Sequence, residues 1–79
     1  MPVNLELERL RGRYGRAVSA LRPAGITDFD GRRVDTLSEG SLIPAGQWVQ
    51  CVEVKGGRVV VRRVDAPPDL ENFDTATLT

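Results

Sequence analysis

The sequence contains no histidine, and it has a single cysteine, Cys51, and a single lysine, Lys55. One cysteine excludes an intrachain disulfide and a thiolate zinc cluster. Without histidine, a metal ion or a thiol nucleophile lacks its usual side-chain partner. Because free cysteine is among the most buried residue types, we expect Cys51 to be an inert core side chain, and we expect neither a metal nor a cofactor.

The sequence also lacks an excess of charge of either sign, because it has eleven basic and eleven acidic residues. This balance gives no electrostatic argument for nucleic acid or for an anionic membrane. The distribution is uneven: Asp69, Glu71 and Asp74 lie in residues 66–79 without a base, which leaves residues 1–65 with a surplus of three positive charges. We interpret this as a mild asymmetry of charge along the chain and not as evidence for a nucleic-acid-binding surface.

No apolar run approaches the roughly 18 residues that a membrane-spanning helix needs, and the N-terminus lacks the apolar core of a signal peptide. We therefore expect this chain alone to be soluble. Composition leaves open that it is a piece of a larger membrane protein.

What the sequence does contain is a series of short β-rich runs separated by glycine and proline. With 79 residues, of which 41% are hydrophobic, it can support one small core. We expect an N-terminal segment or linker over residues 1–11, a barrel over 12–65 and a disordered acidic tail over 66–79. The first expected strand covers residues 14–21, before Pro23.

Two tight hairpins are predicted. Asp30-Gly31 joins residues 26–29 to 32–37, and an Asp-Gly link requires φ > 0 at both positions. This register places Asp28 opposite Arg33 and puts Phe29 on the core face. Gly56-Gly57 joins the second hairpin, with a β-bulge expected at residues 51–53 because the apolar alternation slips there.

The pentapeptide Leu-x-Pro-Ala-Gly occurs twice, at residues 21–25 and 42–46. We interpret both copies as type I turns, with proline in the second turn position and glycine in the fourth. Leu21 and Ile43 should close the core beneath these turns. Arg22, exposed in the first turn, is a candidate contact for a partner.

The ends carry weaker signals. Residues 3–13 fit either a strand or one helical turn that ends at Gly12, and Leu70 and Phe73 could let the tail dock.

Five strands without a necessary helix predict an all-β fold, a small five-stranded barrel of OB-fold or SH3-like type. We expect one contiguous core from these residues: Ala17 or Val18, Leu21, Phe29, Val34, Ile43, Val49, Val54, Val59 and Val61.

The order of "GRYGRAVSALRPAG", "FDGRRVDTLSEG", "LIPAGQWVQCVEV" and "GGRVVV" over residues 12–63 resembles the C-terminal soluble domain of NfeD-like membrane proteins. The resemblance implies an OB-fold barrel that follows transmembrane helices in the inner membrane of a bacterium or archaeon, on the cytoplasmic side. It also implies work beside stomatin- or flotillin-like proteins in membrane organisation or quality control. Long members of the family add a serine protease domain with a Ser–Lys pair, to which nothing here corresponds.

We predict a non-catalytic adapter. Lys55 abuts a Gly-Gly turn and should be exposed, and the carboxylates are scattered over turns and tails. The candidate partner surface consists of Arg22, Arg32, Arg33, Trp48 and Arg62. The alternative is an OB-fold module for single-stranded nucleic acid, with Tyr14, Trp48, Arg32, Arg33, Arg62 and Arg63 as candidates.

Overall fold

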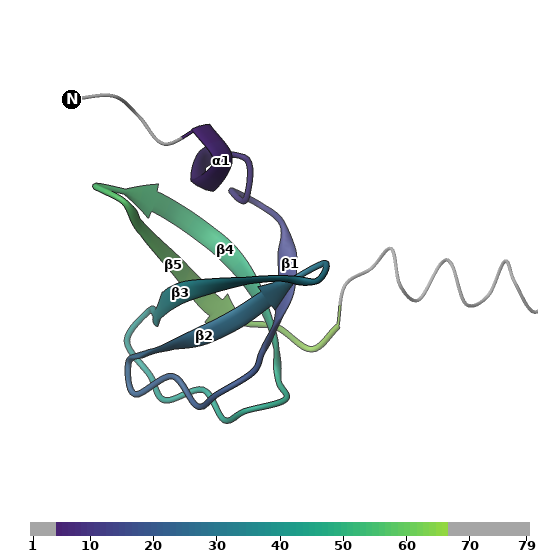
Figure 1. Ribbon diagram of the computed structural model, residues 1–79. Coiled ribbons are helices and arrows are strands. Elements are labelled where there is room, and N and C mark those ends of the chain that lie inside the picture. The colour runs from purple at the N-terminus through teal and green to yellow at the C-terminus, as the bar shows by residue number, and fades with distance from the viewer. Residues whose placement is uncertain (1–4, 67–79) are drawn as a thin grey trace, which may run out of the picture.

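The five strands form a closed barrel in the order β1-β2-β3-β5-β4 (Figure 1). The computed structural model describes residues 5–66, so the expected tail from residue 67 onward lies outside the described residues. The elements are α1 (Leu5–Glu8), β1 (Tyr14–Ala17), β2 (Ala24–Phe29), β3 (Arg32–Ser38), β4 (Trp48–Lys55) and β5 (Arg58–Arg63). Neighbouring strands are antiparallel except for β3 and β5, which pair in parallel. The predicted all-β, OB-fold-like barrel is confirmed.

The β2–β3 hairpin has the predicted turn and register. Asp30 and Gly31 have φ of 52° and 87°, and Phe29 pairs with Arg32. Asp28 lies opposite Arg33 as predicted, and its Oδ1 accepts a hydrogen bond of 2.7 Å from the backbone N–H of Gly31. The Asp28 carboxylate therefore stabilises the turn itself.

The β4–β5 hairpin is also confirmed. Gly56 and Gly57 have φ of 58° and 78°, and Val54 pairs with Val59. The register shifts between Cys51 and Glu53, where the sequence predicts a bulge. This shift lets β4 present buried side chains on both sides of the bulge while it bends around the barrel.

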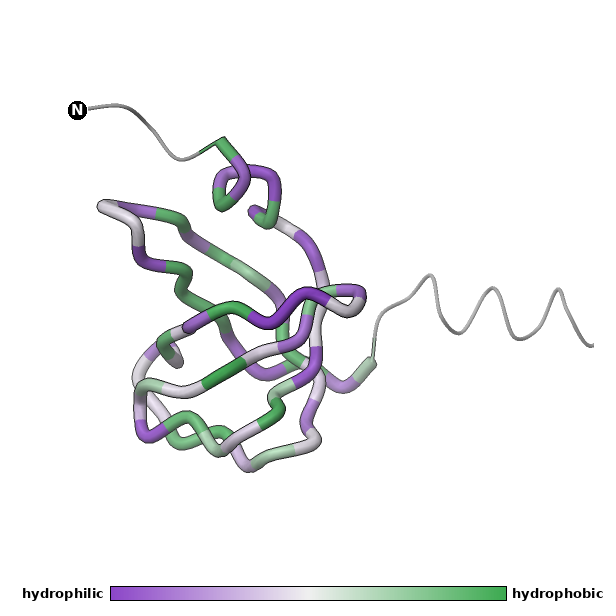
Figure 2. Tube along the Cα trace, in the orientation of Figure 1, coloured by the Kyte–Doolittle hydropathy of each residue, from purple (hydrophilic) through white to green (hydrophobic). Residues whose placement is uncertain are grey.

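The core contains every residue predicted for it. The buried apolar residues are Leu10, Ala17, Leu21, Phe29, Val34, Ile43, Val49, Cys51, Val54, Val59 and Val61. Of the two alternatives in the first strand, Ala17 is buried and Val18 is exposed. Green hydrophobic and purple hydrophilic segments alternate along the strands in Figure 2, as a barrel with one buried face requires.

The first strand is shorter than the predicted 14–21, because β1 ends at Ala17. The amides of Val18 and Ser19 both donate to the carbonyl of Ile26, which interrupts the regular ladder. The chain then returns to the sheet at Leu21, which pairs with Ile43 in an isolated bridge. Both residues are fully buried, so their predicted role beneath the loops is confirmed.

Neither pentapeptide has the predicted turn register. In the first copy, Ala24 and Gly25 already belong to β2, and the Arg22–Pro23 peptide bond is cis. Gly25 is required by close packing instead, since a Cβ there would lie 2.5 Å from Leu21 Cδ2. In the second copy the turn begins one residue later: Gln47 donates to the carbonyl of Pro44, and Gly46 occupies the third position with φ of 89°. Positive φ at the third position is the requirement of a type II turn.

The N-terminal segment is attached to the barrel. Leu10 is buried in the core, and Leu7 packs against it. Gly12 donates to the carbonyl of Cys51 at 2.8 Å, and Cys51 donates to the carbonyl of Arg13 at 2.9 Å. The core thus reaches past the expected boundary at residue 12, because Gly12 and Arg13 extend the pairing of β1 with β4 as far as Cys51. Within residues 5–66, no helix is long and apolar enough to span a membrane.

Candidate functional site

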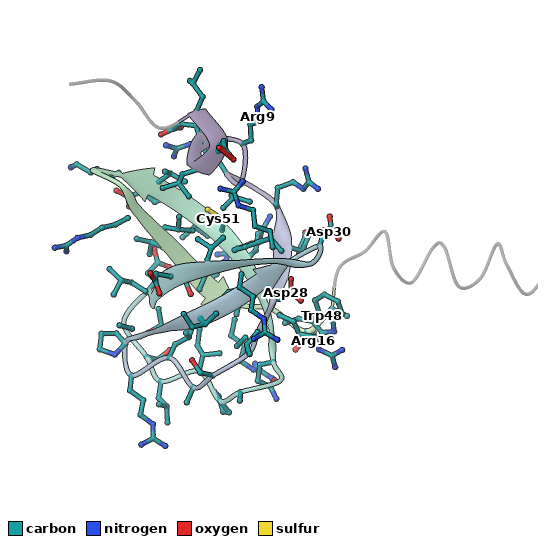
Figure 3. All side chains as sticks on the ribbon, viewed as in Figure 1. Arg9, Arg16, Asp28, Asp30, Trp48 and Cys51 are labelled. Carbon is teal, nitrogen blue, oxygen red and sulfur yellow. The ribbon has the colours of Figure 1, made fainter. Side chains whose placement is uncertain are left out.

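A row of four outward side chains crosses four strands of the barrel. The strand registers place Arg33 opposite Asp28, Asp28 opposite Arg16, and Arg16 opposite Trp48. Directly opposite residues point to the same face of a sheet, so these four side chains share the outer surface. Figure 3 shows Arg16, Asp28 and Trp48 gathered on one side of the barrel.

One end of this row is a stacked pair, Arg16 and Trp48. The guanidinium carbon of Arg16 lies 4.9 Å from the centroid of the Trp48 ring, and Arg16 Nε donates to the carbonyl of Gly46 at 3.2 Å. A cation–π contact at an exposed site contributes about 0.5–1 kcal/mol. Because two contacts hold the Arg16 side chain, the pair presents a half-buried indole and a positive charge in a fixed geometry.

A second row lies beside the first. Tyr14 pairs with Gln50, and Gln50 pairs with Arg62. Gln50 is two residues from Trp48 on the same strand and therefore on the same face. We define the Trp48 surface by five residues on these rows: Arg16, Asp28, Arg33, Trp48 and Arg62.

The structure brings only part of the predicted set together. Arg33, Trp48 and Arg62 lie on the Trp48 surface. Arg32 Nη1 forms an ion pair of 2.9 Å with Glu6 Oε1 and so connects the start of β3 to α1. Arg22 is in the loop between β1 and β2, where it lines a different groove.

Sequence reasoning missed Arg16. The hairpins reveal which residues of β2 and β3 face each other, but the pairing of β1 with β4 joins segments far apart in the chain. The available signal was the expected outward phase of the first strand, in which Arg16 alternates with the buried Gly15 and Ala17. That phase places Arg16 outside but does not identify Trp48 as its neighbour.

The charges of the Trp48 surface are mostly positive, with three arginines and one aspartate. Arginine and tryptophan are enriched where protein interfaces carry most of their binding energy. The guanidinium groups can donate several hydrogen bonds in a plane, which suits carboxylates and backbone carbonyls. The surface therefore combines the apolar area of one indole with guanidinium groups that can donate to acidic groups.

The structure also places the single cysteine and the single lysine of the sequence. Within residues 5–66 there is no group of three or more His, Cys, Asp or Glu side chains that could hold a metal ion. Burial raises the pKa of Cys51, and its thiol lies 3.6 Å from the carbonyl of Glu53. Cys51 is thus a buried core cysteine, as the sequence predicts. Lys55 is exposed at the β4–β5 turn, also as predicted.

The family described as "NfeD-like C-terminal, partner-binding domain" matches residues 7–63. The chain belongs to this family. The NfeD-like domain is also 38% identical over 55 residues to membrane protein NfeD1b of Bacillus subtilis (strain 168). That match covers 70% of this chain and 13% of the relative, so the chain corresponds to a small part of the longer protein.

A solved structure supports the same assignment. The NfeD-like domain resembles the C-terminal domain of stomatin operon partner protein 1510-C from Pyrococcus horikoshii, with a TM-score of 0.69 and 27% identity. The likeness covers 75% of this chain and 94% of that one, so nearly the whole neighbouring domain is the same barrel. Together with the family description, this supports a protein-interaction role for the barrel.

Proposed function

We propose that this barrel is a non-catalytic adapter domain of a membrane-anchored NfeD-like protein that binds a stomatin- or flotillin-like partner. Its work would be in membrane organisation or membrane-protein quality control, with the barrel on the cytoplasmic side of a bacterial or archaeal inner membrane. Two relatives support this setting: one is named a membrane protein and the other a stomatin operon partner protein. The anchor would be supplied by segments outside this chain.

The observation that carries the proposal is the Arg16–Trp48 pair. A half-buried indole that a guanidinium holds in place loses little side-chain freedom when a partner covers it. Arg33 lies on the same row beyond Asp28, and Arg62 lies on the second row opposite Gln50; both would attract acidic groups of the partner. We therefore propose the Trp48 surface as the place where the partner binds.

The test is recovery of the partner by this domain from detergent-solubilised membranes, with the recovered proteins identified by mass spectrometry. We expect the wild type to recover a stomatin- or flotillin-like protein. The double variant Arg16→Ala, Trp48→Ala should recover at least about tenfold less of this partner, because tryptophan and arginine are enriched among interface hot spots. A Lys55→Ala, Arg58→Ala variant is the matched control, since it removes two exposed charges at the β4–β5 turn.

Unfolding curves of both variants establish that the barrel remains folded. Equal recovery by a folded Arg16→Ala, Trp48→Ala variant would place the partner surface elsewhere. A wild-type domain that recovers no partner and instead hydrolyses a peptide would overturn the adapter role itself.

The alternative function, binding of single-stranded nucleic acid, makes a different demand on Trp48. Stacking with a base requires an open ring face, and the Arg16 guanidinium covers one face of this indole. Titration with oligonucleotides at two salt concentrations separates the functions, because true nucleic-acid binding weakens steeply as salt rises. We expect no saturable binding at either concentration.

A further inference from the structure

A groove separate from the Trp48 surface lies between two loops of the barrel. It has a volume of about 780 Å³ and is formed by the β1–β2 loop, the end of β3 and the β3–β4 loop. Its lining consists of Arg22, Pro23, Ser38, Gly40, Ser41 and Leu42. No residue of the Trp48 surface contributes to this lining.

The groove contains hydrogen-bond donors without partners in the described part of the chain. The Ser38 hydroxyl is buried and makes no hydrogen bond there, and only 7% of the residue is exposed. The Arg22 guanidinium is exposed and forms no ion pair with any carboxylate of residues 5–66. Both residues line the same groove, and a buried hydroxyl without a partner destabilises a fold unless a ligand supplies that partner.

Apolar surface lies next to these donors. Leu42 is 56% exposed, one of the three large apolar side chains in residues 5–66 that face solvent. Pro23, on the other wall, is also exposed. A ligand in this groove would therefore combine an acceptor for Arg22 and Ser38 with an apolar group for Leu42 and Pro23.

We propose that this groove binds an extended, acidic peptide segment of a protein partner, with a glutamate or aspartate side chain on Arg22 and Ser38. An adjacent apolar side chain of the peptide packs on Leu42 and Pro23. A single cation beside an apolar wall matches one carboxylate, whereas attraction to an anionic lipid surface requires several basic residues together. The inference rests on the proposed function only in taking a protein as the ligand.

The experiment is a titration of the isotope-labelled full chain with the acetylated, amidated pentapeptide ALELA, followed by backbone amide NMR shifts. We expect saturable shifts centred on residues 38–42 and residue 22. The matched pentapeptide ALQLA, which lacks the charge, should bind about tenfold more weakly, since charge-assisted hydrogen bonds are about twice as strong as neutral ones. Blocked ends keep the terminal carboxylate from contributing.

Three variants of the chain make the test specific. Arg22→Gln should raise the dissociation constant for ALELA about tenfold. Ser38→Ala should raise it about threefold without lowering the melting temperature, because it removes a buried hydroxyl that has no partner in the described fold. Arg58→Gln, which removes an exposed arginine outside the groove, should leave the constant unchanged.

Equal affinity of the wild type and Arg22→Gln for ALELA overturns the proposal, as do shifts centred on Trp48. Binding that appears only after Asp69→Asn, Glu71→Gln and Asp74→Asn also overturns it, because the occupant would then be the chain's own acidic segment. A folded Arg22→Gln variant that fails to bind ALELA, while the wild type recovers no membrane partner, supports the groove and refutes the proposed function.

Discussion

At the scale of single residues, Cys51 illustrates how burial suppresses chemistry. Its side chain is 1% exposed and lies at the bulge of β4. Desolvation is the main cause that raises the pKa of this thiol, and it outweighs the backbone hydrogen bonds at Glu53 and Gly12 and the charge of Arg11. Because the thiolate is the reactive form, the buried thiol should be unreactive.

Stability should depend on pH through this thiol. A folded-state pKa above the ordinary thiol value of 9.0 means that the folded state holds the proton more tightly than the unfolded chain. Stability from this source is complete below that value and declines as pH rises through the folded pKa. We expect the difference in unfolding free energy between the wild type and Cys51→Ala to shrink above about pH 9, measured by urea unfolding under reducing conditions. A difference that stays constant up to the alkaline limit of the fold would contradict this.

Gly15 shows a second residue-scale constraint. A Cβ at this position would lie 2.8 Å from the carbonyl oxygen of Asp28 and 2.8 Å from Cδ1 of Phe29. The absence of a side chain therefore lets β1 and β2 approach each other with the Phe29 ring between them. We expect Gly15→Ala to destabilise the barrel by about 1–3 kcal/mol, as overpacking does, measured as a lower urea midpoint. A fully stable variant would show that β1 and β2 are farther apart.

At the scale of the elements, a buried hydroxyl pair joins β2 and β3. The Oγ1 atoms of Thr27 and Thr36 are 2.7 Å apart, and Thr36 Oγ1 lies 3.4 Å from the carbonyl of Gly25. Both threonines are almost fully buried within a mainly apolar interior. The pair therefore satisfies two polar groups that water cannot reach.

A double-mutant cycle tests this pair. Thr27→Val should destabilise the fold by about 1–3 kcal/mol, because it leaves the Thr36 hydroxyl with a poorer acceptor. The double variant Thr27→Val, Thr36→Val should lose less stability than the sum of the two single variants. It leaves no buried hydroxyl without its partner. Additive single and double losses in urea unfolding would mean that the two hydroxyls do not interact.

The elements also show what the sequence could predict. Both two-residue hairpins, the bulge and the core side chains follow from local rules, because turn chemistry and alternation act over a few residues. The predicted end of the first strand and the predicted turn registers of the pentapeptides were wrong. These features depend on contacts that the local pattern does not show. The carbonyl of Ile26 accepts hydrogen bonds from the two amides after Ala17, and Leu21 packs against Gly25.

The same division applies to the candidate sites. Trp48 and Arg33 were predicted as candidates for the partner surface, but the neighbour of Trp48 required the β1–β4 pairing. Arg22 was predicted as an exposed turn residue, and its groove required the positions of two loops. Arg32 pairs with Glu6, a contact that the sequence spacing does not indicate.

At the scale of the whole molecule, Phe29 lies where β1, β2 and the core meet. It is 5% exposed, and its ring packs closely against Gly15, where a side chain would collide with it. Phe29→Ala should therefore destabilise the domain by about 3–5 kcal/mol, a large part of the stability of so small a fold. Chemical unfolding measures this loss, and an unchanged midpoint would remove Phe29 from the centre of the core.

The strand order has a kinetic consequence. The β2–β3 and β4–β5 hairpins join neighbouring strands, whereas the parallel β3–β5 ladder joins Thr36–Ser38 to Val59–Val61 across the β3–β4 loop and β4. Hairpins form in microseconds, but pairing between distant segments must first overcome the entropy of loop closure. We expect the parallel ladder to form after the transition state. Changes at Leu37 or Val60 should then accelerate unfolding and leave the refolding rate nearly unchanged.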